Sequence, residues 1–135
     1  MQSAHDNEIV SYEVNLRSEK IILHTEYQTS KVDVIFSGVL VHLFEQELPG
    51  SIILRIEKYD IIEFLEDYSE LLKKLKPYCW PFLYKTEEEL RERLLKGQYF
   101  YYVILSSHGL NGWVVAKEYE ALNVDTVFPN LNPIK

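Results

Sequence analysis

Residues 99–119 read YFYYVILSS, then HGLNG, then WVVAKEY, and they form the most aromatic stretch of the chain. We interpret them as two strands joined by a tight turn, for which Asn111-Gly112 is a strong type I′ signal. Apolar residues occupy both faces of the alternation in the first strand, which is typical of a strand covered on both sides. The stretch is therefore predicted to lie at the centre of the fold.

Upstream of this hairpin, four segments alternate apolar and polar residues, as half-buried strands do. Their apolar faces consist of Tyr12, Val14 and Leu16; Ile21, Leu23, Thr25 and Tyr27; Val32, Val34 and Phe36; and Ile52, Leu54 and Ile56. A two-residue turn at Ser18-Glu19 would join the first two strands and set Glu13 opposite His24. A four-residue loop at 28–31 would join the second and third. This pattern predicts an antiparallel sheet with one packed face and one wet face.

Residues 38–50 fit two structures. Val39, Leu40, Leu43, Phe44 and Leu48 follow helical spacing, whereas Val39, Val41 and Leu43 also fit a continued strand. We favour a bend at Gly38 and a short helical segment that ends before Pro49. The continued strand is the alternative.

Two helices are expected between this region and the hairpin. The first spans 60–76, begins at the capping residue Asp60 and is stopped by Pro77. The second spans 86–96 and begins with a capping box of Thr86 and Glu89. The predicted fold class is therefore α+β, with a single antiparallel sheet of about five to six strands and two main helices packed on one face.

The chain has 135 residues, which fits a single domain over 1–135 with loosely ordered tails at 1–8 and 123–135. Its N-terminus has neither the basic region nor the apolar region of a secretory signal. No apolar run approaches the roughly 20 residues needed to span a bilayer. The only cysteine, Cys79, allows no intrachain disulfide and suits a reducing compartment, so we predict a cytoplasmic location.

The formal net charge of −7 argues against binding to nucleic acid or to an anionic membrane, because both favour basic surfaces. It permits a basic protein partner. The densest acidic run contains Glu63, Glu66, Asp67 and Glu70, which are candidate contacts for such a partner. Acids early in a helix and bases late also complement the helix dipole, and that interpretation stays open.

No catalytic, metal-binding or cofactor motif is recognised. Ser106 and His108 invite a nucleophile-and-base interpretation, but the Gly-x-Ser-x-Gly elbow is absent. The four histidines lack the spacing of a zinc site. We therefore predict a protein that is not an enzyme, with no catalytic residues, no metal ligands and no cofactor. The remaining candidates for partner contact are the aromatic residues Trp80, Tyr84 and Trp113, together with His108 at the turn.

Several motifs together carry a resemblance that covers roughly residues 12–119. They are DVIFSGV at 33–39, Phe44-Glu45, Trp80-Pro81 and SSHGLNGWV at 106–114. These motifs resemble small uncharacterised proteins of Bacillus and its relatives, some of which are encoded beside polymorphic toxin genes and look like immunity proteins. The resemblance implies a cytoplasmic protein that binds and blocks a toxin domain, and it implies no catalytic residues.

The sequence therefore favours a non-catalytic protein-binding module, of the immunity type, whose partner is a basic toxin domain. Two other functions stay open. One is a small-molecule-binding or self-associating structural domain, and a dimer is compatible with the sequence. The other, less favoured, is a small hydrolase-like enzyme near His108.

Overall fold

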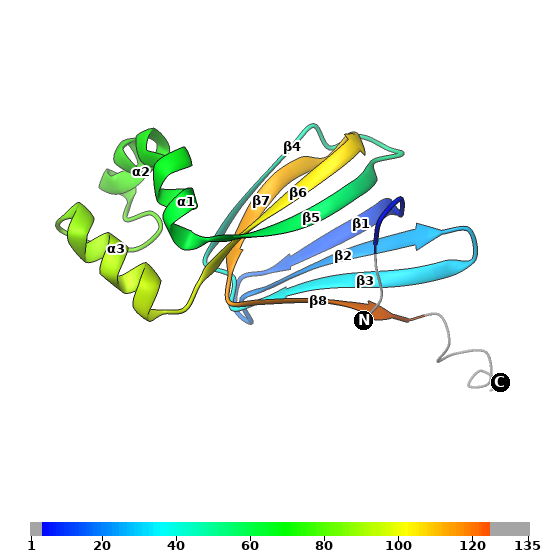
Figure 1. The fold of residues 1–135 in the computed structure, drawn as a ribbon, viewed down its shortest axis with the longest axis horizontal. Helices are drawn as coiled ribbons and strands as arrows, with labels where there is room; N and C mark the ends of the chain where they lie inside the picture. Colours follow the sequence, from blue (N-terminus) through cyan, green and yellow to red (C-terminus); the bar gives the residue numbers. More distant parts are fainter. Residues whose placement is uncertain (1–3, 125–135) are drawn as a thin grey trace.

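The computed structural model describes residues 4–124, which form eight strands in one antiparallel sheet and three α-helices (Figure 1). The strands are β1 (Glu8–Asn15), β2 (Lys20–Tyr27), β3 (Ser30–Ser37), β4 (Val41–Glu45), β5 (Ile52–Asp60), β6 (Phe100–His108), β7 (Asn111–Ala116) and β8 (Glu118–Asn123). The helices are α1 (Ile61–Asp67), α2 (Ser69–Leu75) and α3 (Glu87–Lys96), and a 3-10 turn, η1 (Lys76–Tyr78), follows α2. The α+β class and the antiparallel sheet are confirmed, but the sheet has more strands than predicted.

The sheet order is β4-β7-β6-β5-β1-β2-β3-β8. Strands β1 and β5 share only the pair Glu8–Ile52, so the sheet folds there into two halves. One half contains β4, β7, β6 and β5, and the other contains β1, β2, β3 and β8 (Figure 1). The two halves face each other and bury their inner faces together.

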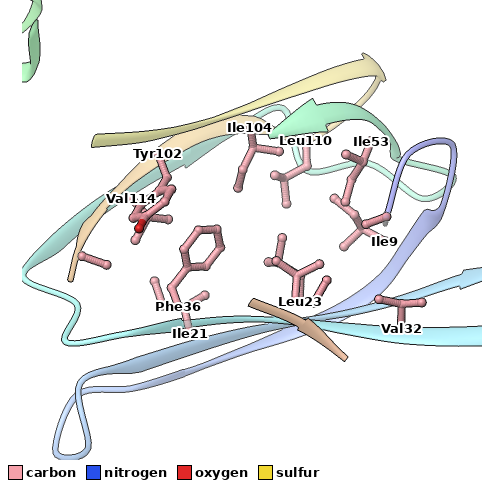
Figure 2. Packing of buried hydrophobic residues seen from close by; sticks show 14 residues of the cluster. Ile9, Ile21, Leu23, Val32, Phe36, Ile53, Tyr102, Ile104, Leu110 and Val114 are labelled. Atoms are coloured by element: carbon pink, nitrogen blue, oxygen red, sulfur yellow. The ribbon is translucent and has the colours of Figure 1, made fainter. Parts of the chain in front are cut away.

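The main core lies between these halves (Figure 2). Leu23, Val34 and Phe36 from the β1-β2-β3-β8 half are fully buried, as the period-two pattern predicted. Tyr102 and Ile104 of β6 reach them from the opposite half. The β4-β7-β6-β5 half therefore packs against the apolar faces of β2 and β3.

A second core joins the helices to the outer face of the β4-β7-β6-β5 half. Phe64 and Leu94 from the helices are fully buried, and they cluster with Tyr101 and Trp113 of the sheet. Strand β6 thus contributes Tyr102 to one core and Tyr101 to the other. The prediction that the first strand of the 99–119 stretch is covered on both sides is confirmed.

The turn of this hairpin lies elsewhere than predicted. Gly109-Leu110 connects β6 to β7, and Gly109 has a φ of +81°, which favours glycine. Gly112 instead lies within β7, opposite Phe44 of β4. The Asn111 side chain accepts from the backbone N–H of Ser106, at 3.1 Å. The type I′ prediction at 111–112 was therefore wrong.

Two strands were missed in the sequence. Residues 41–45 form β4, so the short helix favoured for this region was wrong. The predicted bend at Gly38 is present, and it makes β4 a separate strand where the alternative had a continued one. The chain also breaks at Lys117, and the residues after it form β8, which pairs with β3. With these two edge strands the sheet has eight strands, where about five to six were predicted.

Local register differs from the prediction in both early hairpins. β1 and β2 are joined by residues 16–19, and Val14 pairs with Ile21, where Leu16 had been expected. Leu16 itself is 84% exposed. β2 and β3 are joined by only two residues, 28 and 29, because Tyr27 pairs with Ser30.

Strand β5 contains irregular register steps that change which residues face inward. Ile53 is buried, whereas Leu54, which the alternation pattern had placed inside, is 36% exposed. A bulge adds a residue to one strand only, so it reverses the alternation downstream. A pattern that assumes strict period two cannot predict this reversal.

The predicted helix over 60–76 is interrupted at Tyr68, which ends α1 and precedes α2. Its start is confirmed, because the Asp60 carboxylate accepts from the N–H of Ile62 at 3.0 Å. The start of the second helix is confirmed too, since Thr86 Oγ1 accepts from the N–H of Glu89 at 3.1 Å. The two main helices that were predicted are therefore three.

Only parts of the two predicted loose tails, residues 4–8 and 123–124, lie in the described part of the chain. Ala4 and Asn7 are buried, whereas His5, Asp6 and Glu8 are exposed, so only two side chains of this segment are packed into the fold. Asn123 belongs to β8, and residues 125–135 lie outside the described part of the chain. Within residues 4–124, no helix is long and apolar enough to cross a membrane.

Candidate functional site

The outer face of β1, β2, β3 and β8 carries many charged side chains. The inner face of these strands is buried in the main core, and α1 contacts β5 and β6 in the other half (Figure 1). Directly paired residues share a face in an antiparallel sheet, so the register assigns the outward side chains. The outward charged residues are Glu8, Glu13, Glu26, Asp33, Glu118 and Glu120, with Lys20, Lys31 and His24. We call this surface the acidic sheet face.

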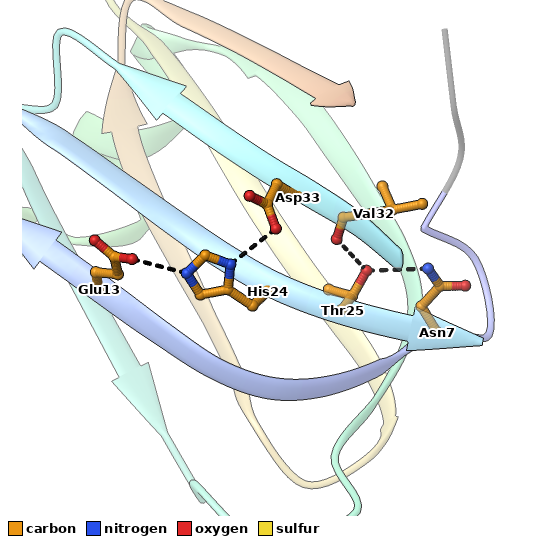
Figure 3. A network of polar contacts seen from close by, with 6 residues as sticks. All are labelled: Asn7, Glu13, His24, Thr25, Val32 and Asp33. Carbon is orange, nitrogen blue, oxygen red and sulfur yellow. Dashed lines mark hydrogen bonds and ion pairs between the residues drawn. The ribbon is translucent and has the colours of Figure 1, made fainter. Parts of the chain in front are cut away.

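His24 joins three strands in the middle of the acidic sheet face (Figure 3). Its Nε2 lies 2.8 Å from Oε2 of Glu13 on β1, and its Nδ1 lies 2.8 Å from Oδ1 of Asp33 on β3. An ionised carboxylate only accepts hydrogen bonds, so a doubly protonated imidazole matches both partners. The sequence predicted the proximity of Glu13 and His24. It did not predict the part played by Asp33.

The surroundings favour the charged form of His24. The hydrogen bond that His24 donates to Glu13 is the largest influence that raises the pKa of His24, and Asp33 raises it further, while partial burial opposes both. Because both ring nitrogens face carboxylates, neither is available to activate a nucleophile. The arrangement therefore acts as an electrostatic link between strands, and it does not have the geometry of a catalytic triad.

This link predicts a pH-dependent contribution to stability. A raised pKa in the folded state means that the contribution is complete below the unfolded pKa of about 6.5 and is lost as the pH rises through the folded pKa. The His24 side chain is 35% exposed, so solvent screening limits the effect to at most about 1 kcal/mol. We expect His24→Gln to reduce the free energy of unfolding at about pH 6 and to have little effect at about pH 9.

Urea denaturation at both pH values measures this difference. His108→Gln is the matched control, because His108 is exposed on a different half of the sheet. An equal cost of His24→Gln at both pH values would contradict the charged link.

Behind His24, a buried polar contact stabilises the same strands. Thr25 is fully buried, and its hydroxyl donates to the carbonyl of Val32 at 2.7 Å (Figure 3). The amide of Asn7 donates to the same hydroxyl oxygen at 3.0 Å. Since both polar side chains are paired, their burial carries no unsatisfied group. The segment before β1 is thereby attached to the sheet close to His24.

A shallow groove of about 650 Å³ runs beside His24 toward β8. Its walls include His24 and Asp33 together with the apolar side chains of Val10, Leu122 and Val124. Val10 lies at a register shift in β1 and is 54% exposed, and Leu122 on β8 is 44% exposed. The acidic sheet face thus combines carboxylates with exposed apolar side chains.

The aromatic residues proposed from the sequence are located in the helix-covered core. Trp113 is 3% exposed, and its ring centroid lies 5.0 Å from Phe64 and 4.9 Å from Tyr68. Tyr84 is also buried, and Trp80 is partly buried beside Trp113. The interpretation of Tyr84 and Trp113 as surface contacts is corrected, because both anchor the core.

The acidic run of the helices is exposed, as a contact surface requires. Glu63, Glu66, Asp67 and Glu70 all lie on the surface of α1 and α2. Asp67 has a structural partner, since the hydroxyl of Tyr101 donates to its carboxylate at 3.3 Å. The helix acids therefore form a second negative surface, separate from the acidic sheet face.

His108 lies at the exposed end of β6. The hydroxyl of Ser106 donates to the carbonyl of Leu110, so it stabilises the turn. Within residues 4–124, His108 has no hydrogen bond or ion pair with a carboxylate. The structure does not bring Ser106 and His108 together as a nucleophile and its base.

Over the described residues, no three His, Cys, Asp or Glu side chains are arranged to hold a metal ion. Neither a protein-family model nor a curated protein matches the chain.

Proposed function

We propose that this protein is a non-catalytic binding module that docks a basic protein partner on the acidic sheet face. The observation that carries the proposal is the composition of that face. Its strands present six carboxylates and two lysines on one side, with the exposed Val10 and Leu122 among them. Complementary charge steers association and fixes orientation, while apolar side chains supply burial energy.

One cross-strand pair supports a cationic partner in particular. Glu8 and Glu26 are directly opposite each other on β1 and β2. Like charges in this position destabilise a sheet, and a basic side chain placed between them would relieve the repulsion. Lys31 is paired with Glu26 on the other side, so it offsets part of this charge.

Within this proposal the partner is a toxin domain and the protein acts in the cytoplasm as its immunity protein. The resemblance of residues 12–119 to proteins encoded beside toxin genes supports that role. A toxin domain that acts on an anionic substrate needs a basic cleft. An acidic sheet face bound over such a cleft would exclude the substrate.

Co-expression with toxin domains encoded in the same genome tests the role, and calorimetry on any complex measures its affinity. Glu13→Gln combined with Asp33→Asn removes two charges from the acidic sheet face with little change in shape. We expect this variant to weaken the complex by about ten-fold, because charge pairs across an interface contribute substantially.

Glu63→Gln combined with Glu66→Gln is the matched control, since it removes two charges from the helix surface. It should change the affinity by less than about two-fold. The reverse result would place the docking surface on the helices. Absence of both rescue and complex formation with every toxin domain would refute the proposed function itself.

A further inference from the structure

The centre of the acidic sheet face is already occupied by a titratable side chain of the protein itself. The imidazole of His24 engages one oxygen of Glu13 and one oxygen of Asp33. A basic side chain that docks at this position needs the same two carboxylates. Partner and imidazole therefore compete for them.

We propose that His24 is a proton-sensitive element of the docking face, so that a basic group binding at Glu13 and Asp33 does so with release of the His24 proton. This inference rests on the proposed function. It adds to that function a regulation of affinity by pH, in which the partner binds more weakly when His24 is charged.

The stereochemistry of imidazole explains the competition. The charged ring donates two hydrogen bonds and holds both carboxylates, whereas the neutral ring has a single N–H and can hold only one. Loss of the proton thus leaves one carboxylate without its donor and removes a positive charge from the contact position. Both changes favour an incoming guanidinium or ammonium group.

The charged groups around His24 come from every neighbouring strand. β1 contributes Glu13 and β3 contributes Asp33 and Lys31, while Glu26 and Lys20 lie on the same face of β2. β8 places Leu122 opposite Asp33 and Glu120 one pair further along. Carboxylates and lysines do not ordinarily titrate between about pH 6 and pH 8.5, so among these groups only His24 changes its charge over this range.

The carboxylate contacts also indicate the direction of the effect. They raise the pKa of His24, which keeps the ring charged closer to neutral pH. A cation that takes over the carboxylates removes this stabilisation, so it must lower the pKa of His24. Linkage is reciprocal, and the affinity for the cation must therefore rise as the pH rises.

A nona-arginine peptide carrying tetramethylrhodamine on its N-terminus is a suitable probe, because neither its guanidinium groups nor the dye changes charge in this range. We expect its affinity, measured by fluorescence anisotropy, to rise about five-fold from about pH 6 to pH 8.5. NMR titration of the His24 ring should show a lower pKa with saturating peptide than without it. His24→Gln should abolish the pH dependence, whereas His108→Gln should retain it.

The possible results distinguish a failure of this inference from a failure of the proposed function. Peptide binding that weakens in the Glu13→Gln/Asp33→Asn variant but does not depend on pH would overturn the role of His24 and leave the docking face intact. A pH dependence that survives in His24→Gln would have the same consequence. Peptide binding that is unaffected by Glu13→Gln/Asp33→Asn would refute the docking face, and the inference with it.

Discussion

Replacement of Phe36 by alanine should lower the free energy of unfolding by about 3–5 kcal/mol. Phe36 is fully buried between the two halves of the sheet. Its ring centroid lies 5.6 Å from that of Tyr102 and 5.4 Å from that of Tyr119. Removal of the ring leaves a cavity in a region where both halves are closely packed, and neither half can collapse into it without breaking strand pairing.

Urea denaturation of the purified variant measures this loss. Leu16→Ala is the control, because Leu16 is 84% exposed and its truncation should cost less than about 0.5 kcal/mol. If Phe36→Ala does not fold, Phe36→Leu keeps most of the volume and should cost about 1.5 kcal/mol. Equal stability of the Phe36 and Leu16 variants would show that the two halves do not pack around Phe36.

Replacement of Gly112 by alanine should destabilise the protein by about 3 kcal/mol. A Cβ at this position would lie 2.1 Å from the carbonyl oxygen of Leu43 and 2.8 Å from the ring of Phe44. The closest of these atoms belongs to the backbone of β4, so it cannot move aside as a flexible side chain would. Relief of the clash requires β4 to separate from β7.

Hydrogen exchange of the β4 amides, together with urea denaturation, measures this effect. Gly50→Ala is the matched control, since a Cβ there meets no atom within 4 Å. Gly50 has a φ of +80°, so its replacement should still cost about 1 kcal/mol in backbone strain. A Gly112→Ala variant that is no less stable than Gly50→Ala would contradict the close approach of β4 and β7.

The acidic sheet face was only partly predictable. Glu13 and His24 were placed on the wet face of the first hairpin, because alternation alone assigns polar residues to one side. The actual register is shifted by two residues, which preserves the face and makes the contact diagonal. Asp33 completes the contact through the pairing of β2 with β3, and the sequence contains no separate signal for it.

The sequence did not decide whether three aromatic residues lie in the core or on the surface. Trp80, Tyr84 and Trp113 have a composition typical of both interfaces and cores. The helices decide between these possibilities, because they cover β6 and β7 and bury Trp113 beneath Phe64. The neighbouring Tyr78 and Leu83 are large apolar side chains that remain exposed, at 78% and 71%.

The sequence by itself determined features that depend on near neighbours. The inward faces of β2 and β3 follow from period-two alternation, and the helix starts at Asp60 and Thr86 follow from capping chemistry. Only the tertiary structure decided that residues 41–45 and 118–123 form strands. Each segment is a strand because it pairs with a distant partner, β7 or β3. The local pattern of 41–45 fitted a helix and a strand alike, and the hydrogen bonds to a distant strand decide between them.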